Sequence, residues 1–156
     1  DVPGRRICLS PRGRRFDQAF AKELAHEPGV VLVCGRYEGI DQRVIEAREM
    51  QEVSLGDFVL TGGEIAAQAL LDATVRLLPG VIGSEQGLDE ESFEDGLLEY
   101  PQYTHPKIWK GRSVPEVLLS GNHKKIAEWK KQQSELVTRN YRPDLWEAYE
   151  GVKVQI

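Results

Sequence analysis

VLVCGRYEGID (residues 31–41) decides the fold together with VSLGDFVLTGGE (residues 53–64). Each stretch begins with β-branched and apolar residues and runs directly into glycines. A buried strand that ends in a tight glycine loop lets bare backbone approach a ligand closely. Two such loops, about twenty residues apart, therefore predict a backbone-lined pocket for a small polar molecule.

Strands alternate with helices around these loops. Apolar runs predict strands over residues 7–9, 30–34 and 58–60. Periodic apolar positions predict helices over residues 14–27, 40–47 and 64–78. Because the run at 30–34 is continuously apolar, we expect a parallel strand that is buried on both faces. The alternation predicts an α/β domain built on a parallel sheet.

An acidic segment follows the α/β part. Residues 83–100 carry seven Asp or Glu and no Lys or Arg, which is typical of a linker between domains. Beyond it, Asn122 is placed to cap a helix that runs to about residue 139, and Arg142-Pro143 begins another. The second part is therefore predicted to be small and helical. Its tryptophans are expected to anchor its core, with the stacking of bases as the alternative: Trp109, Trp129 and Trp146.

The net charge of −5 is unevenly distributed. Residues 101–142 carry nine Lys or Arg against three Glu. Further basic residues stand near the start of the sequence: Arg5, Arg6, Arg12, Arg14 and Arg15. Phosphate binding depends on such local patches and not on the total charge. A phosphate-rich partner is therefore compatible with this sequence, although any single cluster is more often a solvated surface.

Several classes of protein and site are disfavoured. No apolar run approaches the ~20 residues of a membrane helix, and the first residues do not resemble a signal peptide. The sequence does not begin with Met, which we interpret as a fragment or a processed form. Cys8 and Cys34 lie in apolar runs and are expected to be reduced, buried thiols. The three histidines are scattered, so no metal site is expected: His26, His105 and His123.

The glycine spacing matches neither G-x-G-x-x-G nor G-x-x-x-x-G-K-[ST], which disfavours a dinucleotide site and a P-loop. Charged residues near the loops have more than one interpretation. Glu38, Asp41 and Asp57 would accept hydrogen bonds from a ligand or, more commonly, brace their own loops. Arg36 and Arg76 would hold a phosphate or a base edge; alternatively, Arg76 complements the end of its helix.

Longer stretches carry a resemblance to a known family. GRYEGID followed by GDFVLTGGE is the most specific of them. Others follow in order over essentially the whole chain: LSPRGRRFDQ (9–18), RLLPGVIGSE (76–85), EESFEDGLLEYPQYTHP (90–106), VPEVLLSGNHKKIAEW (114–129) and RNYRPDLWE (139–147). With these stretches the chain closely resembles the bacterial tRNA (guanine-N1)-methyltransferases, the TrmD family of the SPOUT (trefoil-knotted) class.

The resemblance implies a fold and a reaction. The fold is a trefoil-knotted parallel-sheet domain over residues 1–83 that binds S-adenosyl-L-methionine, an acidic linker over 84–100, and a small α-helical tRNA-binding domain over 101–156. The reaction is methyl transfer from this cofactor to N1 of the guanine just 3′ of the anticodon. The family further implies a cytoplasmic homodimer with its active site at the subunit interface. Whether activity also needs Mg²⁺ is left open.

The resemblance also implies roles for individual residues. From their charge and position, and not from the resemblance, Arg36, Lys124 and Lys125 are expected to contact the tRNA. Arg76 matches the family's catalytic arginine, and Glu91 stands where the family has its Asp base. Three loops are expected to hold the cofactor through Leu9, Ser10, Pro11, Gly35, Tyr37, Glu38, Gly39, Leu55, Gly56, Asp57, Phe58, Val59, Leu60, Gly62 and Gly63.

Two departures from the family stand out. Glu91 is one methylene longer than Asp, and a misplacement of about 1 Å can cost on the order of 10²-fold in rate. The family's N-terminal strand–helix portion, with its RPYGGGPGM-like loop, has no match in this sequence. We therefore expect this fragment alone not to be fully active. An RNA-binding protein without methyltransferase activity and another SPOUT RNA methyltransferase are kept as alternatives.

Overall fold

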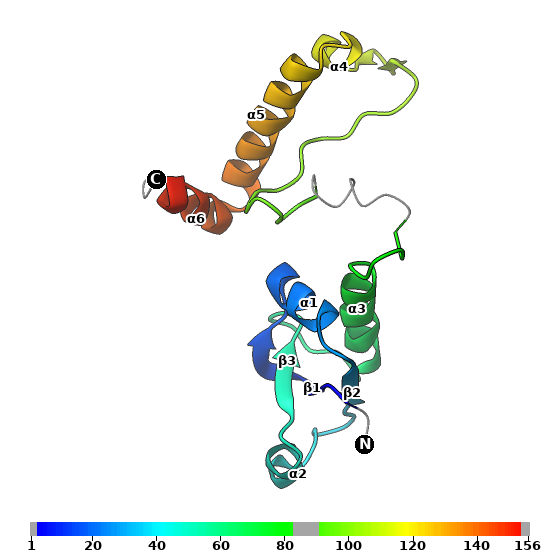
Figure 1. Ribbon diagram of the computed structural model, residues 1–156, viewed down its shortest axis with the longest axis vertical. Coiled ribbons are helices and arrows are strands. Elements are labelled where there is room, and N and C mark those ends of the chain that lie inside the picture. The colour runs from blue at the N-terminus through cyan, green and yellow to red at the C-terminus, as the bar shows by residue number, and fades with distance from the viewer. Residues whose placement is uncertain (1–2, 83–90, 154–156) are drawn as a thin grey trace. The chain divides into compact units, whose positions relative to one another are not determined.

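The computed structural model describes residues 3–82 and 91–153. The chain divides into two compact units, Asp1–Gly83 and Ser84–Ile156. Figure 1 gives the order of the elements within each unit.

The first unit is an α/β domain with a parallel sheet, as predicted. The three strands lie in the order β2-β1-β3, and β1 pairs in parallel with both neighbours. The helices α1 and α3 contact each other and lie side by side in Figure 1. Along the chain the elements are β1 (Arg5–Arg15), α1 (Gln18–Ala25), β2 (Val30–Cys34), α2 (Gln42–Ala47), β3 (Gln51–Ser54) and α3 (Glu64–Val75).

A bulge in β1 interrupts its pairing with β3. Leu9 and Arg14 both lie opposite Val53, so that residues 10–13 protrude from the ladder. The predicted turn at residues 10–13 is thus an interruption of one long strand. This bulge later forms part of a cavity wall.

The core of the first unit draws one or two side chains from each central element. Ile7 of β1 and Phe20 of α1 are completely buried, and Val53 of β3 is 1% exposed. Leu24 and Leu70 complete the cluster from α1 and α3. Burying such side chains stabilises a domain by about 1.5–3 kcal/mol each, and this core fixes the strands that carry the loops.

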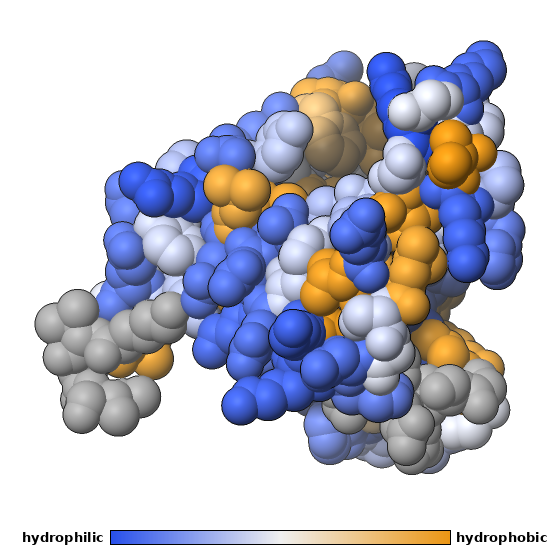
Figure 2. All heavy atoms as spheres, turned by 90° about the horizontal axis from the view of Figure 1, so that it is seen from above, coloured by the Kyte–Doolittle hydropathy of each residue, from blue (hydrophilic) through white to orange (hydrophobic). Residues whose placement is uncertain are grey.

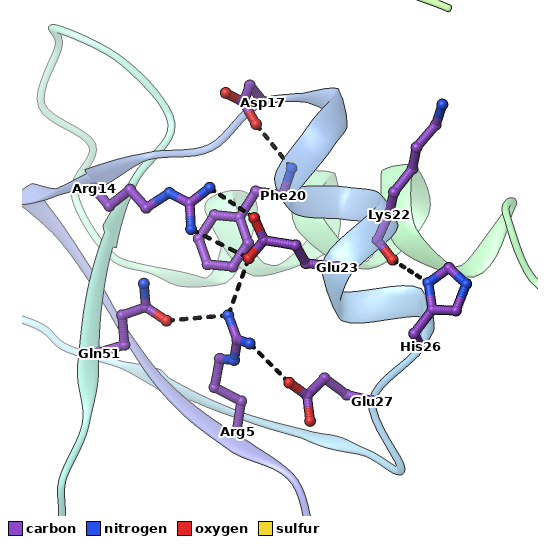
Figure 3. Close-up of polar contacts among 9 residues, drawn as sticks. All are labelled: Arg5, Arg14, Asp17, Phe20, Lys22, Glu23, His26, Glu27 and Gln51. Atoms are coloured by element: carbon purple, nitrogen blue, oxygen red, sulfur yellow. Dashed lines mark hydrogen bonds and ion pairs between the residues drawn. The ribbon is translucent and has the colours of Figure 1, made fainter.

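The start of α1 differs from the expected helix over residues 14–27. Arg14 and Arg15 still pair with β3, and the helix begins only after Asp17, whose carboxylate accepts a hydrogen bond from the Phe20 N–H at 2.8 Å. Figure 3 shows the Arg14 guanidinium over the Phe20 ring, 4.2 Å from its centroid, and bonded to Glu23 at 2.9 Å. Arg14 thus pairs in the strand while its guanidinium contacts the helix that follows.

Two predictions for the first unit are wrong. Residues 58–60 are not a strand; the third strand is β3, and Phe58 and Val59 are 53% and 84% exposed in the loop that follows it. This apolar run lines a cavity instead of pairing in the sheet, so its hydrophobicity alone wrongly predicts a strand. β2 is half-buried throughout instead of buried on both faces, because it lies at an edge of the three described strands. The helices predicted at 40–47 and 64–78 are present in shorter form as α2 and α3.

The second unit is mainly helical, with one short hairpin. Its elements are β4 (Ile108–Trp109), β5 (Arg112–Ser113), α4 (Glu116–Leu119), α5 (His123–Tyr141) and α6 (Pro143–Lys153). Asn122 caps α5 as predicted, accepting from the Lys125 N–H at 3.1 Å. Neither the hairpin nor α4 was expected, because strands of two residues and a single helical turn leave almost no periodic signal.

The aromatic residues of this unit fall into different environments. Trp129 packs near Tyr100 and Tyr103, and Trp146 packs against Tyr149. Trp109 is 56% exposed, so the expectation that it anchors the core is wrong. Figure 2 shows one face of the molecule, on which strongly hydrophobic residues (orange) lie among hydrophilic ones (blue).

Residues 91–100, the described part of the predicted acidic linker, are tied to the second unit. The Leu98 N–H donates to the Thr138 hydroxyl of α5 at 2.7 Å, and the Glu99 N–H donates to the Ser92 hydroxyl at 2.9 Å. The remaining linker residues, 83–90, lie outside the described residues. In the parts of the chain that the structure describes, no helix is both long and apolar enough to span a membrane.

Candidate functional site

A cavity of about 410 Å³ opens in the first unit. Its wall is built by three segments: the β1 bulge, the loop after β2 and the loop between β3 and α3. The volume lies in the range of small-molecule sites, which is about 300–1,000 Å³. All three segments follow the C-terminal ends of parallel strand pairings, where open α/β sheets bind ligands.

Gly63 joins two of these loops. Its N–H donates to the Gly35 carbonyl at 3.3 Å. A Cβ atom at position 63 would lie 2.9 Å from the Cys34 Cα atom, which is closer than real side chains approach backbone. The close packing of the two glycine loops therefore requires glycine at this position.

Exposed apolar side chains line the cavity. Phe58, Val59 and Leu60 are 53%, 84% and 37% exposed, and Tyr37 is fully exposed. Tyr37 also has a φ of 57°, a conformation that costs a non-glycine residue free energy and that clusters at ligand sites. Such surfaces are suited to a flat or apolar ligand group, while nearby loop backbone supplies polar contacts.

An ion pair connects the first glycine loop to the start of α3. The Arg36 guanidinium donates to Glu64 Oε1 through two nitrogens, at 3.0 and 2.6 Å. The pKa of Glu64 is lowered, first by a hydrogen bond from its own backbone N–H and next by the bond from Arg36. Arg36 lines the cavity, so the predicted substrate-binding arginine is oriented by a carboxylate in this structure.

A second ion pair stands at the bulge. Arg12 donates to Glu52 of β3 at 2.9 Å, and both residues line the cavity. Cys8, also in the wall, is buried, and Cys34 is half-buried; both are free thiols. Desolvation is the main cause that raises the pKa of both thiols, which disfavours a nucleophilic thiolate.

Nearly all residues predicted to bind the cofactor lie together in this wall. Asp57 is the exception, because it does not line the cavity. The sequence did not predict several other lining residues: Cys8, Arg12, Ile40, Ile45, Glu52, Val53, Ser54, Thr61 and Ala66. The sequence could have indicated Arg12, because it lies next to Pro11 in the predicted turn at residues 10–13. Glu52 was not, because only the β1–β3 pairing brings it to the bulge.

The predicted catalytic residues belong to different units. Arg76 is the C-cap of α3, half-buried, and its N–H donates to the Asp72 carbonyl at 3.2 Å. Glu91 is half-buried, and its carbonyl accepts from the Glu94 N–H at 3.4 Å. Both residues take part in further interactions. In each case the backbone of the residue is held by a hydrogen bond within its own unit.

Lys124 and Lys125 are exposed in the first turn of α5. No acidic residue accompanies them in that turn. Cations at a helix N-terminus oppose the helix dipole, whereas a phosphate there is favoured by the dipole and by the lysines together. Among the described residues, no group of three or more His, Cys, Asp or Glu side chains is arranged to hold a metal ion.

The comparisons with known proteins agree on one family. The family model described as "tRNA (Guanine-1)-methyltransferase TrmD" matches residues 3–148. A tRNA (guanine-N(1)-)-methyltransferase of Ruegeria pomeroyi is 63% identical over 147 residues, which are 94% of this chain and 60% of that protein. Proteins of the same name from Rhodospirillum rubrum and Bartonella tribocorum are 57% and 59% identical, over 96% and 93% of this chain and 63% and 62% of their own lengths.

The chain thus spans about three fifths of the length of the curated relatives it matches. The match nevertheless includes every segment of the cavity wall as well as Arg76 and Glu91. From the extent of the family match and the identity of the relatives, the chain belongs to the tRNA (guanine-1)-methyltransferase family TrmD.

Proposed function

We propose that this protein transfers a methyl group from S-adenosyl-L-methionine to N1 of the guanine just 3′ of the tRNA anticodon. The observation that carries the proposal is the cavity of about 410 Å³ enclosed by the β1 bulge and the two glycine loops. Membership of the TrmD family supports the same reaction.

The cavity fits the cofactor in size and chemistry. Leu55 and Leu60 offer apolar surface for a flat adenine ring. The loop around Gly35 and Gly63 brings backbone close, because no Cβ atom is tolerated at Gly63. Backbone N–H and C=O groups would then recognise the polar edges of the ligand. When bound, the cofactor supplies an electrophilic methyl group on a sulfonium.

Glu91 and Arg76 are proposed to act on the guanine. N1 carries a proton in neutral guanine, so its lone pair becomes available for the new C–N bond only when that proton leaves. The Glu91 carboxylate would accept the proton, a contribution of about 10²–10⁴-fold for a well-placed base. Arg76 would stabilise the negative charge that develops on O6.

The second unit is proposed to bind the tRNA. Lys124 and Lys125 would meet phosphates at the start of α5. We further propose a SPOUT knot in the first unit and a homodimer in which Glu91 serves the partner's cofactor site, as the family implies. A tRNA substrate implies a cytoplasmic location.

The test is a methylation assay with the full chain as its gene encodes it. Purified protein is incubated with labelled S-adenosyl-L-methionine and tRNA transcripts that carry either guanine or adenine 3′ of the anticodon. We expect label only in the guanine transcript, and N1-methylguanosine at that position by mass analysis of nuclease fragments. An EDTA arm decides whether Mg²⁺ is required.

Two results would contradict the proposal. Tight tRNA binding without methyl incorporation would favour an RNA-binding protein without this activity. Incorporation at another nucleotide or into rRNA would favour a different RNA methyltransferase.

A further inference from the structure

The hairpin of β4 and β5 presents an exposed tryptophan. Trp109 pairs with Arg112 across the hairpin, and Ile108 pairs with Ser113. Side chains directly opposite in an antiparallel pair share a face, so Trp109 and Arg112 share one face of the ribbon and Ile108 lies on the other. Trp109 remains 56% exposed and Ile108 63% exposed.

The turn is built to hold this arrangement. Lys110 and Gly111 have φ angles of 49° and 77°, the positive values of a two-residue type I′ turn that matches the twist of a hairpin. The Lys110 ammonium lies over the indole, 5.0 Å from a ring centroid. A cation in this place holds the ring by a cation–π interaction and puts positive charge beside its exposed surface.

Trp109 differs from the other tryptophans of the chain. Trp129 and Trp146 both contact aromatic rings of their own unit, whereas among residues 3–82 and 91–153 Trp109 has a ring contact with Lys110 only. Because Trp109 is 56% exposed, burial of its ring contributes little to the stability of the hairpin. The exposed ring is therefore available to a partner.

The charge around the hairpin selects the kind of partner. Lys107, Lys110 and Arg112 lie within six residues, and Glu116 is the nearest acidic residue after them. No ion pair neutralises these three cations within the described part of the chain. Cations that neutralise phosphates beside an aromatic ring that stacks a base are the combination found in single-strand nucleic-acid binding.

From these observations we infer that Trp109 stacks on an unpaired base of the RNA substrate while Lys110 and Arg112 contact its phosphates. This inference rests on the proposed function and adds to it a contact outside the cofactor cavity and outside α5. Trp109 is a positioning residue, since the cavity wall that would hold the reacting atoms lies in the first unit.

The test compares hairpin variants of the full chain for binding to a tRNA transcript. Trp109→Ala is expected to raise the Kd for tRNA about tenfold to a hundredfold, the range expected when one base loses its stacking partner. Trp109→Phe keeps a stacking face and should stay within about threefold of the wild type. Ile108→Ala, on the other face of the same hairpin, is the matched control and should leave the Kd unchanged.

Further readouts separate stacking from a purely structural role. Trp109→Ala should raise KM for tRNA more than it lowers kcat, and should leave cofactor affinity, thermal midpoint and oligomeric state unchanged. Replacing Lys110 and Arg112 by Gln should flatten the dependence of log K on log salt by about 0.7–0.9 for each phosphate that the variant no longer neutralises.

The outcomes distinguish this inference from the proposed function. Trp109-dependent tRNA binding without methyl transfer would leave the hairpin contact standing and contradict the function. Methyl transfer with an unchanged Kd in Trp109→Ala would overturn the hairpin contact alone. Loss of tRNA binding in Ile108→Ala as well, together with a changed oligomeric state, would identify the hairpin as a protein contact and overturn it too.

Discussion

The first unit completely buries Ile7 and Phe20, whereas among the described residues of the second unit Leu97 is the one hydrophobic side chain that is buried. The second unit instead leaves Trp109 and Tyr141 56% and 75% exposed. A packed core holds the loops of the first unit in one arrangement, which suits a preorganised cavity. The open surface of the second unit, with its many cations, suits a large charged partner.

This difference predicts which unit carries each step of the proposed reaction. Rigid cofactor binding is expected in the first unit, which has the larger buried core, and RNA contacts are expected in the second unit, which has one buried hydrophobic side chain among its described residues. Glu91 is the informative exception, because it belongs to the second unit and yet is proposed to act on the reacting base.

The largest effect is expected at Glu91. Glu91→Gln removes the proposed proton acceptor and should lower kcat by about 10²–10⁴-fold, with cofactor affinity by calorimetry unchanged. Glu91→Asp is the matched control, since the family uses Asp at this position, and it should retain activity. If Glu91→Gln turns over at the wild-type rate, the base lies elsewhere and the proposed contribution of the second unit to chemistry fails.

A second prediction addresses the two cores. Phe20→Ala removes a completely buried ring and should lower the free energy of unfolding by about 3–5 kcal/mol in urea denaturation. Leu136→Ala removes a side chain that is 51% exposed on α5, and the cost should stay within about 0.5 kcal/mol. An equal loss in the free energy of unfolding in Phe20→Ala and Leu136→Ala would show that the second unit has a core comparable to that of the first.

The sequence predicts these two units unequally. The bounds of β2 and the first residue of α3 agree with the predictions from apolar runs and glycines. The apolar run at 58–60 is misleading, since a ligand cavity and a sheet interior both select apolar residues. Non-local pairing explains what was missed at the site, because Glu52 reaches the wall only through β1–β3 pairing. The strands of the hairpin at Trp109 are too short to show a periodic pattern of apolar residues.

A third prediction compares one glycine from each unit. Gly63→Ala forces a Cβ atom to within 2.9 Å of backbone, and should cost about 1–3 kcal/mol of stability and weaken cofactor binding. In Gly151→Ala the new methyl group meets nothing within 4 Å, and a helical alanine should stabilise by up to about 1 kcal/mol. Thermal melting and cofactor calorimetry test both variants, and normal cofactor affinity in Gly63→Ala would contradict the close-packed loops.

The smallest effect concerns pH. The pKa of Glu64 is lowered, first by the hydrogen bond from its own backbone N–H and next by Arg36, so these interactions of the carboxylate stabilise the protein above the ordinary glutamate pKa. This contribution is lost as the pH falls through the lowered value. In an NMR titration, Arg36→Gln should move the Glu64 pKa upward.

Asp144 is the control from the second unit, because its pKa is lowered mainly by Arg142 and should not respond to Arg36→Gln. An unchanged Glu64 pKa in Arg36→Gln would mean that the hydrogen bond from the Glu64 backbone N–H alone lowers this pKa.

The most direct measurement is an experimental structure of the full chain with S-adenosyl-L-methionine. The expected result is ligand density in the cavity of the first unit, with the adenine against Leu55 and Leu60 and contacts to the backbone near Gly35 and Gly63. Ligand density elsewhere, or an empty cavity at a cofactor concentration that supports methyl transfer, would contradict the assignment of this cavity to the cofactor.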